Sequence, residues 1–145
     1  MTRKKIITVP ILLVELEDQN FHILIETTLS NEIKGKWVVD TGASKTVFDV
    51  NQTDHFSIIE MLHAEIQSAG LGEGNIDTQM GELHVLTIGD IELLNEPVAL
   101  IDLSFINEIY SRFTSENIVG LIGSDFLVHH QAVINFKKKE MKLYF

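Results

Sequence analysis

The stretch Trp37-Val38-Val39-Asp40-Thr41-Gly42 decides the fold. Its apolar start is typical of a buried β-strand, and the acid, threonine and glycine that follow are typical of the turn that ends one. A strand that ends in this way delivers one carboxylate to the mouth of a β-structure. Much later in the chain, Gly120-Leu121-Ile122-Gly123 places an apolar pair between two glycines. We interpret the two stretches as parts of one site.

Each residue of the turn has a chemical role in this interpretation. Gly42 suits a turn because glycine tolerates backbone angles that a Cβ forbids. The Thr41 hydroxyl can bond a neighbouring backbone group or the same residue of a second subunit. Two carboxylates held together in an apolar cleft share one proton, so that the charged one activates water while the protonated one donates to a carbonyl. One chain supplies only one of them, Asp40.

These segments resemble a known family. The stretch Val38 to Ser44, followed by Thr46-Val47-Phe48, and the later stretch Val119 to Leu127 are similar to the motifs of the retropepsin-like aspartic proteases. The resemblance covers Phe21 to Phe136. It implies a mainly β fold, a closed β-barrel of the acid-protease type with two or three short helices. It also implies a homodimer that hydrolyses peptide bonds with water, without a cofactor, a metal or a covalent intermediate.

The resemblance also assigns site residues, position by position. The catalytic candidates are Asp40, Thr41 and Gly42. A flap would come from Ser68 to Gly74, because alternating glycines favour a mobile hairpin whose closure excludes water. An ordinary flexible loop is the alternative interpretation of those glycines. The substrate-binding candidates, in the flap and the catalytic loop, are Ala43, Ser44, Gly70, Leu71, Gly72 and Gly74.

Two positions depart together from the viral members of the family. Many of these carry an acid and an arginine that form an ion pair, where this chain has Ser44 and Ser124. Losing one partner of a buried pair leaves an uncompensated charge, whereas losing both need not destabilise the fold. The double change therefore indicates a divergent branch of the family, and it removes support for a viral-like substrate preference.

The length of the chain predicts a single domain that works in pairs. A chain of 145 residues fits one retropepsin-like domain over 1–145, with a core at 20–136, an N-terminal strand or hairpin at 1–19 and a C-terminal strand at 137–145. The chain has no second Asp-Thr-Gly, and Asp125 is followed by Phe126 instead. The site must then form at an isologous interface between two copies. Chain ends often interleave in this family, so the longer ending here is expected to alter that interface.

Composition excludes several function classes. The formal net charge of −10 argues against nucleic-acid binding, which depends on basic patches. The absence of cysteine excludes disulfides and thiol catalysis. The start resembles a signal peptide only superficially, because Pro10 and Glu15 interrupt its apolar run. We expect a cytoplasmic protein without a membrane segment.

The pattern of apolar residues predicts the secondary structure in outline. Phe105, Ile109 and Phe113 are expected to share the buried face of a helix that Ser104 caps. A hairpin is expected at 6–16 and 21–29, a strand at 36–39, flap strands at about 65–71 and 77–88, strands at 91–94 and 98–103, helices at 52–63, 104–115 and 124–129, and a closing hairpin at 132–136 and 140–145.

Three functions are consistent with the sequence. The leading one is a homodimeric aspartic endopeptidase acting on a peptide or protein substrate, with a water molecule activated between two Asp40 carboxylates. The second is a non-catalytic peptide-binding or scaffold module with the same fold. The third is a self-processing element, against which we count the start at Met1 and the scarcity of flanking sequence to cut.

Ala43 predicts the pH range of activity. Pepsin-like enzymes often have a serine here, whose hydroxyl stabilises the charged aspartate, and alanine cannot supply that bond. We therefore predict maximal peptidase activity in the mildly acidic to near-neutral range, measured as a pH profile of kcat/KM. A strongly acidic optimum would contradict this prediction.

Overall fold

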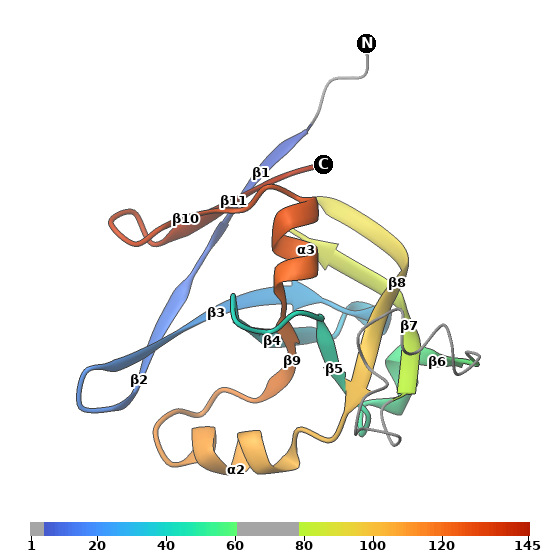
Figure 1. The fold of residues 1–145 in the computed structure, drawn as a ribbon, viewed down its shortest axis with the longest axis horizontal. Coiled ribbons are helices and arrows are strands. Elements are labelled where there is room, and N and C mark those ends of the chain that lie inside the picture. Colours follow the sequence, from blue (N-terminus) through green and yellow to red (C-terminus); the bar gives the residue numbers. More distant parts are fainter. Residues whose placement is uncertain (1–4, 61–78) are drawn as a thin grey trace.

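The computed structural model describes residues 5–60 and 79–145, and most of these residues lie in β-strands (Figure 1). The helices are α2 (Ser104–Ser111) and α3 (Ser124–His129), with 3-10 helices at Ser30–Glu32 and Thr53–His55. The strands are β1 (Ile6–Pro10), β2 (Leu12–Glu17), β3 (Asn20–Thr28), β4 (Lys34–Val39), β5 (Val47–Asp49), β6 (Phe56–Ile59), β7 (Gln79–Ile88), β8 (Ile91–Ile101), β9 (Ile118–Ile122), β10 (Val133–Asn135) and β11 (Glu140–Tyr144). The mainly β fold predicted from the sequence is confirmed.

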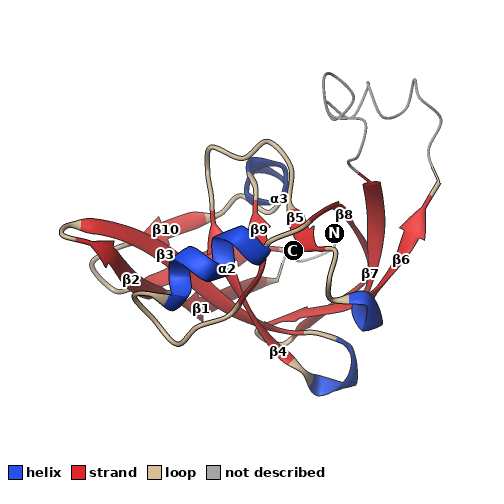
Figure 2. Ribbon diagram, turned by 90° about the horizontal axis from the view of Figure 1, so that it is seen from below, coloured by secondary structure: helices blue, strands red, loops and turns tan. Residues whose placement is uncertain are grey.

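The described strands form two sheets (Figure 2). The larger has the order β2-β3-β4-β9-β5-β8-β7-β6, and Thr28 of β3 also pairs with Thr87 of β7, so six of its strands form a closed ring. The smaller has the order β1-β11-β10. Within the larger sheet, β9 pairs parallel to β4 and antiparallel to β5. The loop between β4 and β5 therefore passes over the end of β9, and this loop contains Asp40.

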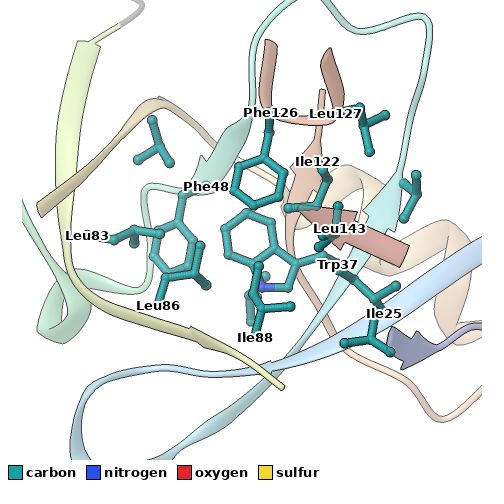
Figure 3. Close-up of a cluster of buried hydrophobic side chains, with 14 of the residues drawn as sticks. Ile25, Trp37, Phe48, Leu83, Leu86, Ile88, Ile122, Phe126, Leu127 and Leu143 are labelled. Carbon is teal, nitrogen blue, oxygen red and sulfur yellow. The ribbon is translucent and has the colours of Figure 1, made fainter. Parts of the chain in front are cut away.

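The core is centred on Trp37, which is completely buried (Figure 3). Its ring packs against Phe48 with centroids 5.6 Å apart, and its Nε1–H donates to Thr27 Oγ1 at 2.7 Å. Burial of an indole requires such a partner, because an unpaired buried donor destabilises the fold. Trp37 also lies opposite Gly120 in the β4–β9 pairing. This tryptophan therefore fixes the position of the strand that ends at Asp40.

The N-terminal segment differs from the hairpin that we predicted. Strands β2 and β3 do pair about Asp18 and Gln19, and Gln19 has a left-handed φ of 64°. The predicted strand at 6–16 is broken at Ile11, however, because Ile11 N–H donates to Lys139 O at 3.0 Å. Strand β1 thereby joins β11 in the smaller sheet, and β2 stays with β3.

Two further predictions of secondary structure were wrong. The predicted helix at 52–63 is a 3-10 helix at Thr53–His55 followed by strand β6, whose edge pairing with β7 overrides the helical spacing; residues 61–63 lie outside the described residues. The predicted break at 95–97 is absent, because β8 runs continuously from Ile91 to Ile101. Pro97 pairs with Glu82 at a point where β8 does not pair with β5, so its missing N–H breaks no bond on that side.

Helix α2 begins at Ser104 as predicted, but it ends at Ser111 instead of residue 115 and buries another face. Tyr110 is buried, whereas Phe105 is 71% exposed, because the helix packs through the face one residue further along. Ser104 does not cap the helix: its N–H and its hydroxyl both donate to Asp102 Oδ1, at 2.9 and 2.6 Å. These bonds, the hydroxyl first, lower the pKa of Asp102. Among the described residues, no helix is long and apolar enough to cross a membrane.

We predict that Gly120→Ala strongly destabilises the protein. A Cβ built on Gly120 would lie 2.3 Å from the Trp37 ring and 2.5 Å from Val47 O, and neither can move without displacing a strand. Overpacking of this kind costs about 3 kcal/mol of unfolding free energy, which denaturant titration measures.

Gly42→Ala is the matched control, because its Cβ would meet only Asp40 Oδ1, at an ordinary contact distance of 3.4 Å. Its unfolding free energy should stay within about 0.5 kcal/mol of the wild-type value. Equal stability of the two variants would show that the Trp37–Gly120 contact does not constrain the fold.

Candidate active site

Asp40 follows directly on β4, and its backbone is fixed by the neighbouring strand. Asp40 N–H donates to Ile122 O at 2.9 Å, which extends the parallel β4–β9 pairing by one residue. Ala43 N–H then donates to Asp40 O at 3.2 Å and closes a turn. Asp40 is half-buried, whereas Thr41 and Gly42 at the tip of the turn are exposed. The sequence thus places a carboxylate at the end of a strand and leaves the tip of the following turn exposed to solvent.

Gly42 contributes a hydrogen bond rather than an unusual backbone conformation. Its N–H donates to Asp40 Oδ1 at 3.0 Å and orients the carboxylate. Gly42 does not have a positive φ; among the described glycines only Gly89 has one, at 59°. The turn therefore does not require glycine for its backbone angles, contrary to our prediction from the sequence.

The glycines near the end of β9 hold this loop in place. Ser124 N–H donates to Ala43 O at 2.7 Å, and a Cβ on Gly123 would lie 2.6 Å from the carbonyl of Lys45. The two stretches singled out in the sequence are therefore in direct contact. Where viral relatives are expected to have an ion pair, a backbone hydrogen bond connects the two segments that contain Ser44 and Ser124.

Asp125 holds the loop between β4 and β5 through hydrogen bonds to Thr46, a role that we did not predict from the sequence. Its carboxylate accepts from Thr46 Oγ1 at 2.7 Å, from Thr46 N at 3.1 Å and from Phe126 N at 2.8 Å. Thr46 Oγ1 in turn accepts from Gly123 N at 3.1 Å. Asp125 and Thr46 are 79 residues apart, so no local spacing could have indicated this network. It fixes the far end of the loop that Asp40 begins.

Asp40 lines a cavity of about 380 Å³, a size common for ligand pockets. Its walls are largely apolar, and among the described residues that line it Asp40 is the one acidic residue. Phe21 and Phe136 are 58% and 60% exposed, so they form the mouth of the cavity. The lining residues are Phe21, His22, Ile23, Val38, Val39, Asp40, Ile106, Tyr110, Leu121 and Phe136.

Two polar aromatic residues share the cavity with Asp40. The Tyr110 hydroxyl lies 2.8 Å from His22 Nδ1, and the two rings meet edge-on. Burial, and to a smaller extent the charge of Asp40, raise the pKa of Tyr110 to about 12. The hydroxyl therefore stays protonated throughout the physiological range. In the sequence, the i, i+4 spacing of Ile106 and Tyr110 indicates the face of α2 that lines the cavity. Our prediction placed the neighbouring face of the helix in the core instead.

A second cavity, of about 460 Å³, lies on another part of the molecule between β8 and α3. Asp125, Glu96 and His129 are among the residues that line it. Burial raises the pKa of Glu96; His129 opposes this effect and Asp125 adds to it. Asp40 does not line this cavity.

The flap candidates Gly70, Leu71, Gly72 and Gly74 lie outside the described residues. Of the other candidates, Asp40 lines the first cavity, and Thr41, Gly42, Ala43 and Ser44 follow it in the loop. Within the described part of the chain, no group of three or more acidic, histidine or cysteine side chains is placed to hold a metal ion.

A ring of β-strands with a single Asp-Thr-Gly loop over the end of a Gly-flanked strand defines the retropepsin class of fold. A crystal structure of a retropepsin-like aspartic protease from Rickettsia conorii is similar, with a TM-score of 0.51 and 16% identity over 100% of this chain and 96% of that chain. The retroviral protease-like domain of Ddi1 from Leishmania major gives a TM-score of 0.48 and 16% identity, over 80% and 82% of the two chains. No curated protein matches.

The family model described as aspartyl protease matches residues 25–126, which span most of the chain, including the Asp40 loop and β9. The chain belongs to this aspartyl protease family.

We predict that Asp125→Ala destabilises the protein by about 1–3 kcal/mol, because it leaves the donors of buried Thr46 without an acceptor. Asp125→Asn should cost less, since its amide oxygen can still accept from Thr46. Denaturant titration of both variants measures the difference. If both were as stable as the wild type, the Asp125 network would not support the loop.

Proposed function

We propose that this protein is a homodimeric aspartic endopeptidase whose active site pairs Asp40 of one subunit with Asp40 of the other. The observation that carries the proposal is the isolated Asp40 carboxylate. Within residues 5–60 and 79–145, it is the one acidic residue that lines the apolar cavity, and it lies next to an exposed Thr41-Gly42 tip. Because the chemistry of the family requires two carboxylates, the second one comes from another copy.

Association through the Asp40 loop is consistent with the packing of the chain ends. Lys5 and Phe145 exchange two backbone hydrogen bonds of 2.8 Å, which extend the β1–β11 pairing within one chain. In this arrangement, Lys5 and Phe145 pair with each other within one chain. The proposed subunit contact includes the loop at residues 41–44, in which Thr41, Gly42 and Ser44 are exposed, and its two-fold axis passes between the two Asp40 side chains.

In the proposed reaction, the carboxylates share one proton. The charged Asp40 takes a proton from water as the water attacks the scissile carbonyl, and the protonated Asp40 donates to the carbonyl oxygen. Gly42 N–H holds Oδ1 of each aspartate at 3.0 Å, so the carboxylate does not have to be ordered when substrate binds. Thr41 braces the two loops across the axis. The apolar walls exclude bulk water and strengthen these interactions.

The second candidate function is a peptide-binding or scaffold module with the same fold. The cavity and its aromatic mouth, Phe21 and Phe136, would serve this function without a second carboxylate. The two functions differ in whether the chain dimerises through the Asp40 loop.

We predict that Asp40→Asn lowers the rate of peptide hydrolysis by about 10²–10⁴-fold or more, because one general acid or base contributes a factor of that size. The assay is the digestion of a proteome-derived peptide mixture, with cleavage sites identified by mass spectrometry. Asp18→Asn is the matched control, because Asp18 is an exposed acid in the β2–β3 turn, and it should retain wild-type activity. Retention of activity by Asp40→Asn would overturn the assignment of the catalytic residue.

Mixing the two proteins tests the dimer directly. If each site needs two Asp40 residues, adding excess Asp40→Asn protein to a fixed amount of wild type forms mixed dimers and lowers activity in proportion to the wild-type fraction. The added protein should have no effect on an active monomer. Sedimentation over a concentration series gives the association state of each sample, and an inactive monomer would favour the peptide-binding module.

A further inference from the structure

Helix α2 brings Tyr110 to the cavity as a fixed wall. The helix lies in the connection between β8 and β9, and Asn107 anchors it to the start of β9. Asn107 Nδ2 donates to Ile118 O at 2.9 Å, and Ile118 N–H donates to Asn107 Oδ1 at 2.7 Å. Tyr110 is only 4% exposed. Its hydroxyl is therefore held in place by the same strand that positions the Asp40 loop.

Tyr110 and His22 have unused hydrogen-bonding capacity. A phenol offers one donor and acceptor lone pairs, and an imidazole has two nitrogens that can each make a bond. Their mutual bond of 2.8 Å uses one position on each group. Both residues line the cavity, so the remaining positions are available to a group that enters it.

The rest of the cavity suits the body of an aromatic side chain. Apart from Asp40, the other described residues that line it are apolar, and Phe21 and Phe136 flank its mouth. A cavity of about 150 Å³ is enough to hold benzene, and this one is larger, at about 380 Å³. The cavity therefore has largely apolar walls, with the polar pair Tyr110 and His22 near Asp40.

We propose that Tyr110 and His22 form the polar end of a side-chain subsite beside Asp40, and that they select a tyrosine-like substrate residue, apolar in its body and hydroxylic at its tip. This inference rests on the proposed function, in that Asp40 is taken as the residue at the scissile bond. It identifies Tyr110 and His22 as specificity-determining residues, not as catalytic ones.

The preference follows from the cost of burying unpaired polar groups. A phenylalanine side chain would cover the Tyr110–His22 pair and leave its free positions without water or a partner, whereas a tyrosine hydroxyl would bond one of them. Because Tyr110 is a neutral phenol at physiological pH, it brings no second negative charge near Asp40. A single neutral hydrogen bond changes affinity by about three- to tenfold.

The test compares two small probes, N-acetyl-tyrosinamide and N-acetyl-phenylalaninamide, by NMR titration of the full chain. We expect about three- to tenfold tighter binding of the tyrosine amide, with shift changes at Tyr110 and His22. In Tyr110→Phe, and in His22→Phe as a second variant, the preference for the tyrosine amide should fall, because each variant removes one of the two polar groups. Tyr144→Phe is the matched control, because Tyr144 is the other tyrosine of the chain and pairs with Ile6 in the smaller sheet. It should keep the wild-type preference.

Equal binding of the probes to the wild type, no binding up to the solubility limit, or a preference that is undiminished in both cavity variants would each overturn the proposed subsite. The result is independent of hydrolysis. A tyrosine preference in a protein that cleaves no peptide would contradict the proposed function alone, whereas Asp40-dependent cleavage without any preference would contradict the subsite alone.

Discussion

The site depends on the contact between the Trp37 ring and the backbone of Gly120. The indole is fully buried and its N–H is bonded to Thr27, so the ring has one position, and that position leaves no room for a side chain on the neighbouring strand. Strands β4 and β9 are thereby brought side by side in a fixed register, in which Asp40 N–H reaches Ile122 O. A residue with a Cβ in place of the glycine would push the strands apart and move the carboxylate with them. The position of Asp40 is in this sense a consequence of core packing.

The loop that follows Asp40 is held by hydrogen bonds at both ends, and its middle is exposed to solvent. Gly123 lets the loop lie directly on the end of β9, and the bonds from Thr46 to Asp125 hold its far end. Between them, Thr41 and Gly42 are exposed. The exposed tip beside an ordered carboxylate leaves this surface accessible to the second copy that the proposed function requires. The rigidity of the loop also means that association would bring together two carboxylates that are already oriented.

The sequence predicted the parts of the fold in which local pattern and tertiary packing agree. The apolar run before Asp40 and the closing hairpin at 132–136 and 140–145 both form close to where they were expected. Prediction failed where a neighbouring strand decides the conformation, as at Phe56, which has helical spacing but pairs with Leu83 of β7. The site followed the same rule. The Asp40 turn is a local motif, whereas the Tyr110–His22 pair joins residues 88 positions apart and becomes visible only once α2 is placed.

The difference between these two parts of the site suggests how specificity is built on this fold. The residues around Asp40 use backbone hydrogen bonds and close glycine contacts, which allow little variation in the side chains involved. Helix α2, in contrast, lies in a connection between strands and is joined to the ring through Asn107, so its cavity-facing residues can change without moving Asp40. Connections carry function in this way because the scaffold tolerates change there. Ile106 and Tyr110 would then set which side chain the cavity accepts, while the β4–β9 pair keeps the carboxylate in place.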